Sequence, residues 1–188
     1  MDTRQIVFGG FLALISWLFQ LLPVVFSEIF VFITILSAIP VYIGSRIGSK
    51  IGVMVYIVAG FLVSVLSVHE GLFFFFTNGI VGLTLGIARY YTTKKFYIGL
   101  ISGAFLTISL SIMIYLFDIL VFGTDIPGSI PVQLAILFGF SFIYCSMFNI
   151  LSDFIYKRVI EKLWLYPLVS GYFFLFTCYN YCNIKLED

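Results

Sequence analysis

Residues 46–95, RIGSKIGVMVYIVAGFLVSVLSVHEGLFFFFTNGIVGLTLGIARYYTTKK, contain two long apolar runs separated by a short polar turn. Lys and Arg occur at both ends of this stretch, whereas the turn in its middle carries His69 and Glu70 and no Lys or Arg. Each run approaches the roughly 20 apolar residues that a helix needs to cross a bilayer. Because cytoplasmic loops are enriched in Lys and Arg, the stretch predicts a hairpin of two membrane helices with both ends cytoplasmic.

The composition extends this prediction to the whole chain. Of its 188 residues, 62% are hydrophobic and 10% are charged, whereas a soluble domain carries about 25% charged residues. We expect an integral membrane protein with almost no soluble part, folded as one domain over residues 1–188. The predicted architecture is all-α, a bundle of six to seven transmembrane helices at about 6–22, 27–45, 51–68, 71–89, 97–122, 131–156 and, in seventh place, 163–183.

The positions of the basic residues predict the orientation. The ten Lys and Arg fall at the N-terminus, after the second, fourth and sixth runs, and near the C-terminus: Arg4; Arg46 and Lys50; Arg89, Lys94 and Lys95; Lys157, Arg158 and Lys162; and Lys185. With a cytoplasmic N-terminus, every one of these groups except Lys185 lies on the cytoplasmic side. The run at 163–183 is long enough to cross, but Pro167, Asn180 and Asn183 also suit an interfacial segment. We therefore expect a multi-pass protein of the cell membrane.

Motifs for enzyme chemistry are missing from the sequence. The chain has a single His, so His69-Glu70 is not a zinc-protease signature. It also lacks a nucleophile elbow and a phosphate-binding loop ending in Lys-Ser or Lys-Thr. The net charge of +1 provides no basic arm for nucleic acid. We expect no catalysis, no metal and no cofactor, and any energy for transport must come from another subunit.

Polar side chains instead gather in the half of the predicted bundle opposite the basic residues: Trp17, Gln20, Glu28, His69, Glu70, Asn78, Tyr115, Asp118 and Gln133. Polar groups near hydrocarbon are costly and are therefore candidate functional groups. From this set we predict a substrate-binding site made of Trp17, His69, Glu70, Asn78, Tyr115 and Asp118. The alternative for each is interfacial solvation or helix capping, and for Asp118 it is a helix end before the loop at 124–131.

The charges of this outer half bear on the solute. Glu28, Glu70, Asp118 and Asp125 are all acidic, and no Lys or Arg accompanies them. An acidic outer half favours a cationic or neutral solute over an anion. The competing explanation is that the positive-inside rule alone removes Lys and Arg from this side.

Small residues four apart form strips on several predicted helices, and Gly9 with Ala13 forms one in the first run. Such strips let membrane helices approach closely. One interpretation is packing within the chain. The other is a docking face for a partner protein, for which the first helix is the better candidate because terminal helices are often peripheral.

Three segments resemble the S components of energy-coupling-factor transporters: TRQIVFGGFLALISWLFQLLP (3–23), IPVYIGSRIGSKIG (39–52) and HEGLFFFFTNGIVGLTLGIARYY (69–91). The likeness covers roughly residues 3–122. Gly9 and Ala13 match the spacing of two alanines by which that family's first helix contacts a transmembrane coupling subunit, with glycine in place of the first alanine. A seventh span would exceed the usual helix count of the family.

The resemblance implies a function. Such a chain is the substrate-binding membrane subunit of a bacterial importer for a vitamin or similar micronutrient, and separate ATPase subunits energise it through the coupling subunit. The alternative is a non-transporting, S-component-like scaffold that assembles with partner membrane proteins.

Overall fold

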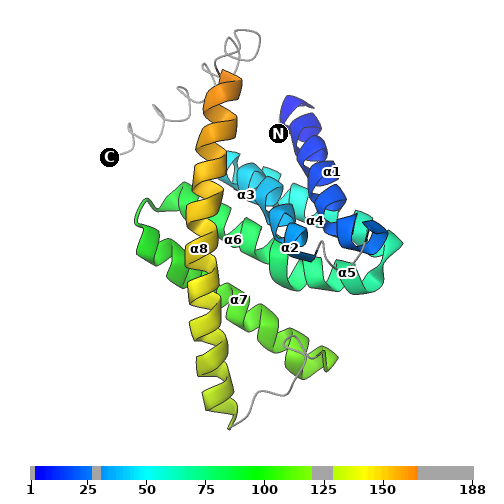
Figure 1. Ribbon diagram of the computed structural model, residues 1–188. Coiled ribbons are helices and arrows are strands. Elements are labelled where there is room, and N and C mark those ends of the chain that lie inside the picture. Colours follow the sequence, from blue (N-terminus) through cyan, green and yellow to red (C-terminus); the bar gives the residue numbers. More distant parts are fainter. Residues whose placement is uncertain (1–2, 27–30, 120–128, 165–188) are drawn as a thin grey trace. The chain divides into compact units, whose positions relative to one another are not determined.

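A computed structural model describes residues 3–26, 31–119 and 129–164, and within these ranges the chain is helical and contains no strand. In chain order (Figure 1) the elements are α1 (Thr3–Phe26), α2 (Val31–Thr34), the 3₁₀ turn η2 (Ile35–Ser37), α3 (Ala38–Ile47), α4 (Ser49–Leu66), α5 (Val68–Phe73), the π-helical turn η3 (Phe74–Asn78), α6 (Gly79–Tyr91), α7 (Lys95–Phe117) and α8 (Ile130–Trp164).

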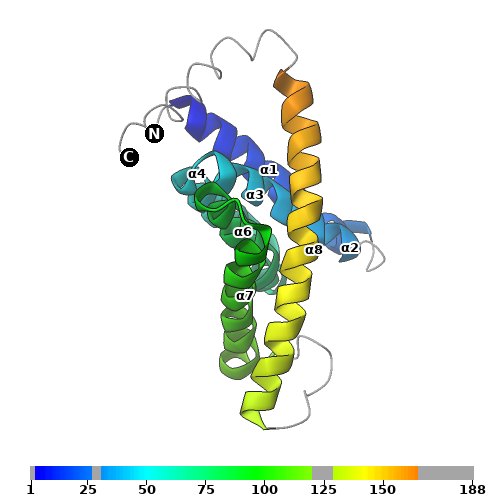
Figure 2. The same ribbon diagram turned by 90° about the vertical axis from the view of Figure 1, so that its left-hand side faces the viewer.

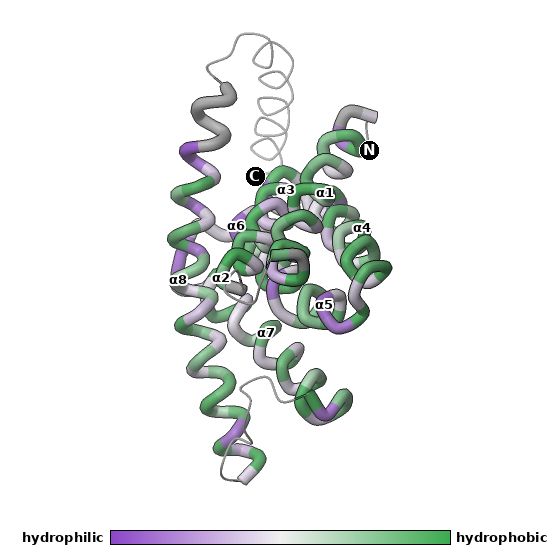
Figure 3. The backbone as a smooth tube through the Cα atoms, turned by 45° about the vertical axis from the view of Figure 1, so that its right-hand side comes forward, coloured by the Kyte–Doolittle hydropathy of each residue, from purple (hydrophilic) through white to green (hydrophobic). Residues whose placement is uncertain are grey.

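Five of the helical stretches are long and apolar enough to cross a membrane: Gln5–Val24, Ser49–Leu66, Val68–Tyr91, Lys95–Phe117 and Ile130–Arg158. A shorter apolar stretch, Phe32–Ile47, falls where the second span is predicted. Figure 3 shows apolar residues along most of α1 and α4 and a hydrophilic stretch at α5. The all-α class is confirmed, and the helices are compatible with a multi-pass membrane protein. The predicted run at 163–183 lies outside the described residues apart from its start.

The chain divides by its internal contacts into two compact units, residues 1–150 and 151–188. The boundary falls inside the continuous helix α8. Each unit is considered by itself, and all contacts discussed below belong to residues 1–150.

The centre of the first unit is the contact between α3 and α6, which lie side by side (Figures 1 and 2). Gly82 faces the backbone carbonyl of Ala38, and Gly86 faces Tyr42 and Ser45. Because the later residue of α6 contacts the later residues of α3, the two helices run parallel. Tyr42 is fully buried in this contact region, as is Leu85. A Cβ atom at Gly82 or Gly86 would overlap atoms of α3, so glycine is required for this close approach, as small residues generally are where membrane helices pack tightly.

The parallel pairing brings the basic residues together at one end. Arg46 lies near the end of α3 and Arg89 near the end of α6, and α7 begins at Lys95 after a short connection. Helix α4 starts beside the end of α3, because Gly52 faces Ser45. We call this the basic end. The charge pattern of the sequence thus corresponds to one end of a helical bundle, while the side of the membrane that this end faces stays a prediction.

Helix boundaries differ from the sequence prediction at several places, among them the end of α7 at Phe117 instead of 122 and the end of α8 at Trp164 instead of 156. Helix α1 continues through Pro23 to Phe26, whereas the first predicted span ends at residue 22. A proline inside a helix removes one backbone hydrogen bond to the carbonyl four residues earlier, and only three helical residues follow Pro23. The second predicted span is divided into α2, η2 and α3.

The α3–α6 contact yields a stability prediction. A methyl group at Gly82 would overlap the backbone carbonyl oxygen of Ala38, whereas a methyl group at Gly10 would meet no atom within 4 Å. We expect Gly82→Ala to lower the free energy of unfolding by about 1–3 kcal/mol through overpacking. Gly10→Ala should leave it unchanged or raise it by up to about 1 kcal/mol, since alanine is the better helix former. Thermal unfolding of both variants in detergent measures the difference, and equal midpoints would contradict this packing.

Candidate functional site

A fully buried glutamine is the centre of the outer-half polar residues. The Gln20 side chain is 1% exposed and makes three side-chain hydrogen bonds. Its oxygen accepts from the Ser37 hydroxyl at 2.9 Å and from the Asn78 amide at 3.2 Å. Its own amide donates to a Glu70 carboxylate oxygen at 2.9 Å. One side chain of α1 therefore connects the second and fourth predicted spans and the turn that precedes the fourth.

Ser16, one turn before Gln20 on α1, extends the same set of contacts. Its hydroxyl donates to the backbone carbonyl of Ser37 at 2.6 Å. Ser37 ends the 3₁₀ turn η2, and both serines are fully buried. We call Ser16, Gln20, Ser37, Glu70 and Asn78 the Gln20 cluster. It lies opposite the basic end, because Gly9 of α1 faces the start of α4 whereas Gln20 reaches Glu70 beyond the end of α4.

Glu70 lies in the first turn of α5, where two capping contacts are available. Ser67 is the N-cap of α5, and its hydroxyl accepts from the backbone N–H of Glu70 at 3.4 Å. In a full capping box the glutamate would return to the N–H of the capping serine. Here the Ser67 N–H donates instead to the Val63 carbonyl. The Glu70 carboxylate is thereby left to accept from Gln20, and its half-buried position keeps part of it near the surface.

Asn78 reaches Gln20 from the end of the π-helical turn η3. A π turn removes some backbone carbonyls from the regular helical pattern, and such turns occur frequently at functional sites. Three hydroxyls donate to carbonyls in or next to this turn. Tyr56 donates to the Phe75 carbonyl at 3.0 Å, Ser109 donates to the Phe76 carbonyl at 2.7 Å, and Thr77 donates to the Phe73 carbonyl. Helices α4 and α7 therefore help to hold the turn that carries Asn78.

Trp17 and His69 lie beside the cluster in sequence without joining it through a hydrogen bond. The Trp17 indole nitrogen is buried and has no hydrogen-bond partner among the described residues. This N–H is a buried donor without an acceptor, so a ligand that supplied an acceptor atom would remove the cost of the unsatisfied group. His69 is exposed and stacks edge-on against Phe73, with ring centroids 4.8 Å apart.

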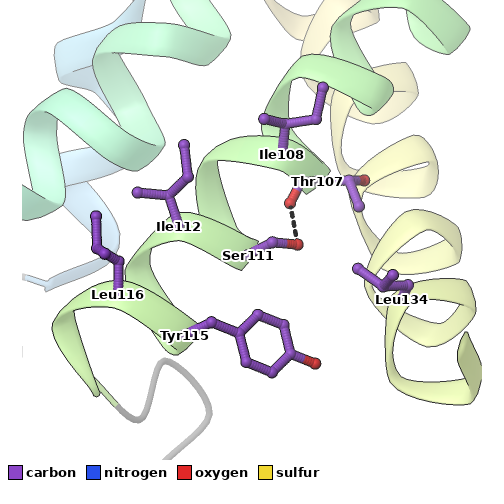
Figure 4. Close-up of a pocket in the computed structure, with 7 residues that line it drawn as sticks. All are labelled: Thr107, Ile108, Ser111, Ile112, Tyr115, Leu116 and Leu134. Carbon is purple, nitrogen blue, oxygen red and sulfur yellow. Dashed lines mark hydrogen bonds between the residues drawn. The ribbon is translucent and has the colours of Figure 1, made fainter. Parts of the chain in front are cut away.

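Tyr115 lies elsewhere, in a groove of about 490 Å³ that is open on one side. We call it the α7–α8 groove, and Figure 4 shows its lining residues: Thr107, Ile108, Ser111, Ile112, Tyr115, Leu116 and Leu134. The Tyr115 hydroxyl donates to the Gln133 side-chain oxygen at 2.5 Å. The groove lies between the fifth and sixth predicted spans, away from the basic end, and it is open and mainly apolar.

Asp118 has a local structural role. Its φ of 53° places it in the left-handed region, directly after α7. The following residue, Ile119, donates its N–H to the Met113 carbonyl at 3.2 Å, which closes the helix end. Aspartate tolerates this backbone conformation better than most residues with a side chain. The helix-end alternative for Asp118 is thus realised, and its solute contact stays a prediction.

The Gly9–Ala13 pair lies inside the bundle. Gly9 faces Met54 and Ile51 of α4, and Ala13 is fully buried. Packing within the chain, the first of the two interpretations, therefore describes this strip. A role in docking a coupling subunit stays a prediction.

The structure thus connects two of the six predicted binding residues, Glu70 and Asn78, and it does so through Gln20. Sequence reasoning noted Gln20 among the polar residues but did not select it, and it passed over Ser16 and Ser37. A signal was present, because Gly9, Ala13, Ser16 and Gln20 follow one helix face. Glu28 and Asp125 lie outside the described residues.

The chain matches no protein family, no curated protein and no solved structure.

The Gln20 cluster predicts a large effect of one substitution. Gln20→Met keeps the shape of the side chain but leaves Ser37, Glu70 and Asn78 without their partner. An unsatisfied buried polar group costs about 1–3 kcal/mol, so we expect a loss of at least about 2 kcal/mol in the free energy of unfolding. Gln133→Met removes the bond to Tyr115, which is 50% exposed, and the loss of a bond to an exposed group should cost about 1 kcal/mol or less. Reversible unfolding in mixed detergents compares the two, and similar losses would refute the central role of Gln20.

Proposed function

We propose that this protein is the substrate-binding membrane subunit of an energy-coupling-factor importer for a vitamin or a similar micronutrient. The observation that carries the proposal is the Gln20 cluster, in which side chains from three separate segments meet in the half of the bundle opposite the basic end. The resemblance of residues 3–122 to S components supports it. So does the helical arrangement, in which five long apolar helices and one shorter one cover the described residues.

The polarity of the cluster argues for a binding role. Apolar residues could fill this space at lower cost, because polar groups in hydrocarbon require complete hydrogen bonding. Ser37 and Asn78 donate to Gln20, and Glu70 accepts from it. A solute with a neighbouring donor and acceptor could take over these bonds with little change in their number. The Trp17 N–H offers one further donor nearby on α1.

Under this proposal the solute enters from the end opposite the basic residues, where Glu70 is half-buried and its carboxylate becomes accessible to the solute. An accessible carboxylate favours a neutral or cationic solute. ATP hydrolysis would take place on separate subunits, and a transmembrane coupling subunit would transmit the conformational change. The basic end would face the cytoplasm, in agreement with the positive-inside rule.

One observation favours a second candidate, a non-transporting S-component-like scaffold. The described bonds of the Gln20 cluster are made within the chain, and the pocket beside Tyr115 is an open groove and not an enclosed chamber. In a scaffold, the sole role of such a polar network would be to fix how the helices assemble. The two candidates differ in whether a solute binds.

A ligand screen tests the proposal. The purified protein is heated with single vitamins and related micronutrients, and a bound solute at about 100 times its Kd should add about 2.7 kcal/mol of stability. Asn78→Leu should abolish the added stability. Thr84→Val should retain it, because the Thr84 hydroxyl donates to backbone carbonyls within α6 and takes no part in the cluster.

Purification from native membranes separates the two candidates. The importer subunit should retain ATPase subunits, identified by mass spectrometry. Binding of no solute, together with stable complexes that contain no ATPase, would reject the importer in favour of the scaffold.

A further inference from the structure

The α7–α8 groove differs from the Gln20 cluster in position and chemistry. On α7 its lining forms two adjacent rows at four-residue spacing, one of Thr107, Ser111 and Tyr115 and one of Ile108, Ile112 and Leu116. Figure 4 shows the first row directed toward α8, from which Leu134 completes the wall. The volume of about 490 Å³ lies within the range of small-molecule sites.

The hydroxyls inside the groove offer little to a polar ligand. Thr107 donates to the Gly103 carbonyl and Ser111 donates to the Thr107 carbonyl, each at 2.8 Å. Their protons are thus used within α7, and the rest of the interior wall is aliphatic. The part of an occupant that lies in the groove is therefore apolar, because a polar part would lose its hydration without gaining donors.

Polar groups stand at one end of the groove only. Tyr115 lies two residues before the end of α7 and is 50% exposed, and its hydroxyl meets Gln133 near the start of α8. Tyrosines are enriched at this level of membrane proteins, where the apolar core meets the headgroups. Toward the basic end α7 and α8 approach closely, because a methyl group at Gly103 would lie 3.1 Å from the Phe142 Cα. This contact narrows the space between them at this level.

These features define the shape of the occupant. From Thr107 to Tyr115 the groove runs about 12 Å along the helix, at 1.5 Å per residue. It is apolar along this length, narrowed at its deep end by the Gly103–Phe142 contact, and polar at the end that carries Tyr115 and Gln133. We infer that the α7–α8 groove binds one hydrocarbon chain of a bilayer lipid, whose headgroup lies beside Tyr115 and Gln133. The site is independent of solute uptake and stands on the groove alone.

Photolabelling tests this inference. The full-length protein is placed in nanodiscs that contain a phospholipid with a diazirine on its acyl chain, and the labelled residues are identified by mass spectrometry. Ile108 and Leu116 are 59% and 74% exposed, and Ile57 and Phe61 on α4 are 54% and 64% exposed. A bound acyl chain should label the α7 pair at least about fourfold more than the α4 pair. A fourfold ratio corresponds to the burial of about one additional methylene group of the lipid.

Filling the groove provides the matched control. Ser111→Phe and Leu134→Trp, placed on different helices, should each reduce labelling at Ile108 to the level of α4. Val58→Phe, on the exposed face of α4, should not. Labelling in proportion to exposure on all faces, or labelling that persists in both filled variants, would overturn the inference. Intermolecular disulfides formed by Ile112→Cys and absent from the wild type would assign the groove to a second copy of the chain, and would overturn it as well.

Discussion

Hydrocarbon offers no hydrogen-bond partner, so a chain that lies in it must satisfy its polar groups with its own atoms. This constraint explains the arrangement around Gln20. A glutamine side chain that is 1% exposed would be strongly unfavourable in lipid by itself. With Ser37, Asn78 and Glu70 as partners, it becomes a connection between segments that are far apart in the sequence. The same side chain that would be costly alone therefore fixes how the helices are placed.

Two interrupted helices make these contacts possible. A regular α-helix through residues 31–47 would extend the apolar surface without interruption. The 3₁₀ turn η2 interrupts this helix and ends on Ser37. The π turn η3 likewise ends on Asn78. The backbone carbonyls that η3 displaces accept from Tyr56 and Ser109, so its irregularity is compensated by α4 and α7. Each turn ends on a buried residue, Ser37 or Asn78, which agrees with the rule that irregular backbone in a membrane is tolerated where protein covers it.

Glycine has the complementary role at the other contacts. Gly82 and Gly86 bring α6 onto α3, and Gly103 brings α7 onto α8. Where backbones approach closely no side chain can enter, and where the helices α7 and α8 separate toward Tyr115 the groove opens. The division between packed and open parts of the bundle thus follows the distribution of small residues. The Gly9–Ala13 strip belongs to the packed part, against α4.

The sequence by itself determined the all-helical class, the presence and approximate limits of apolar helices long enough to cross a membrane, and the gathering of Arg46, Lys50, Arg89 and Lys95 near helix ends. These properties follow from hydropathy and charge summed along short stretches of chain, which do not depend on neighbouring helices. Only the tertiary structure decided that Gln20 and not Trp17 connects Glu70 with Asn78, that Asp118 closes α7, and that Gly9 faces inward. Those outcomes depend on the rotation of each helix about its axis and on the chain beside it, and no local pattern contains that information.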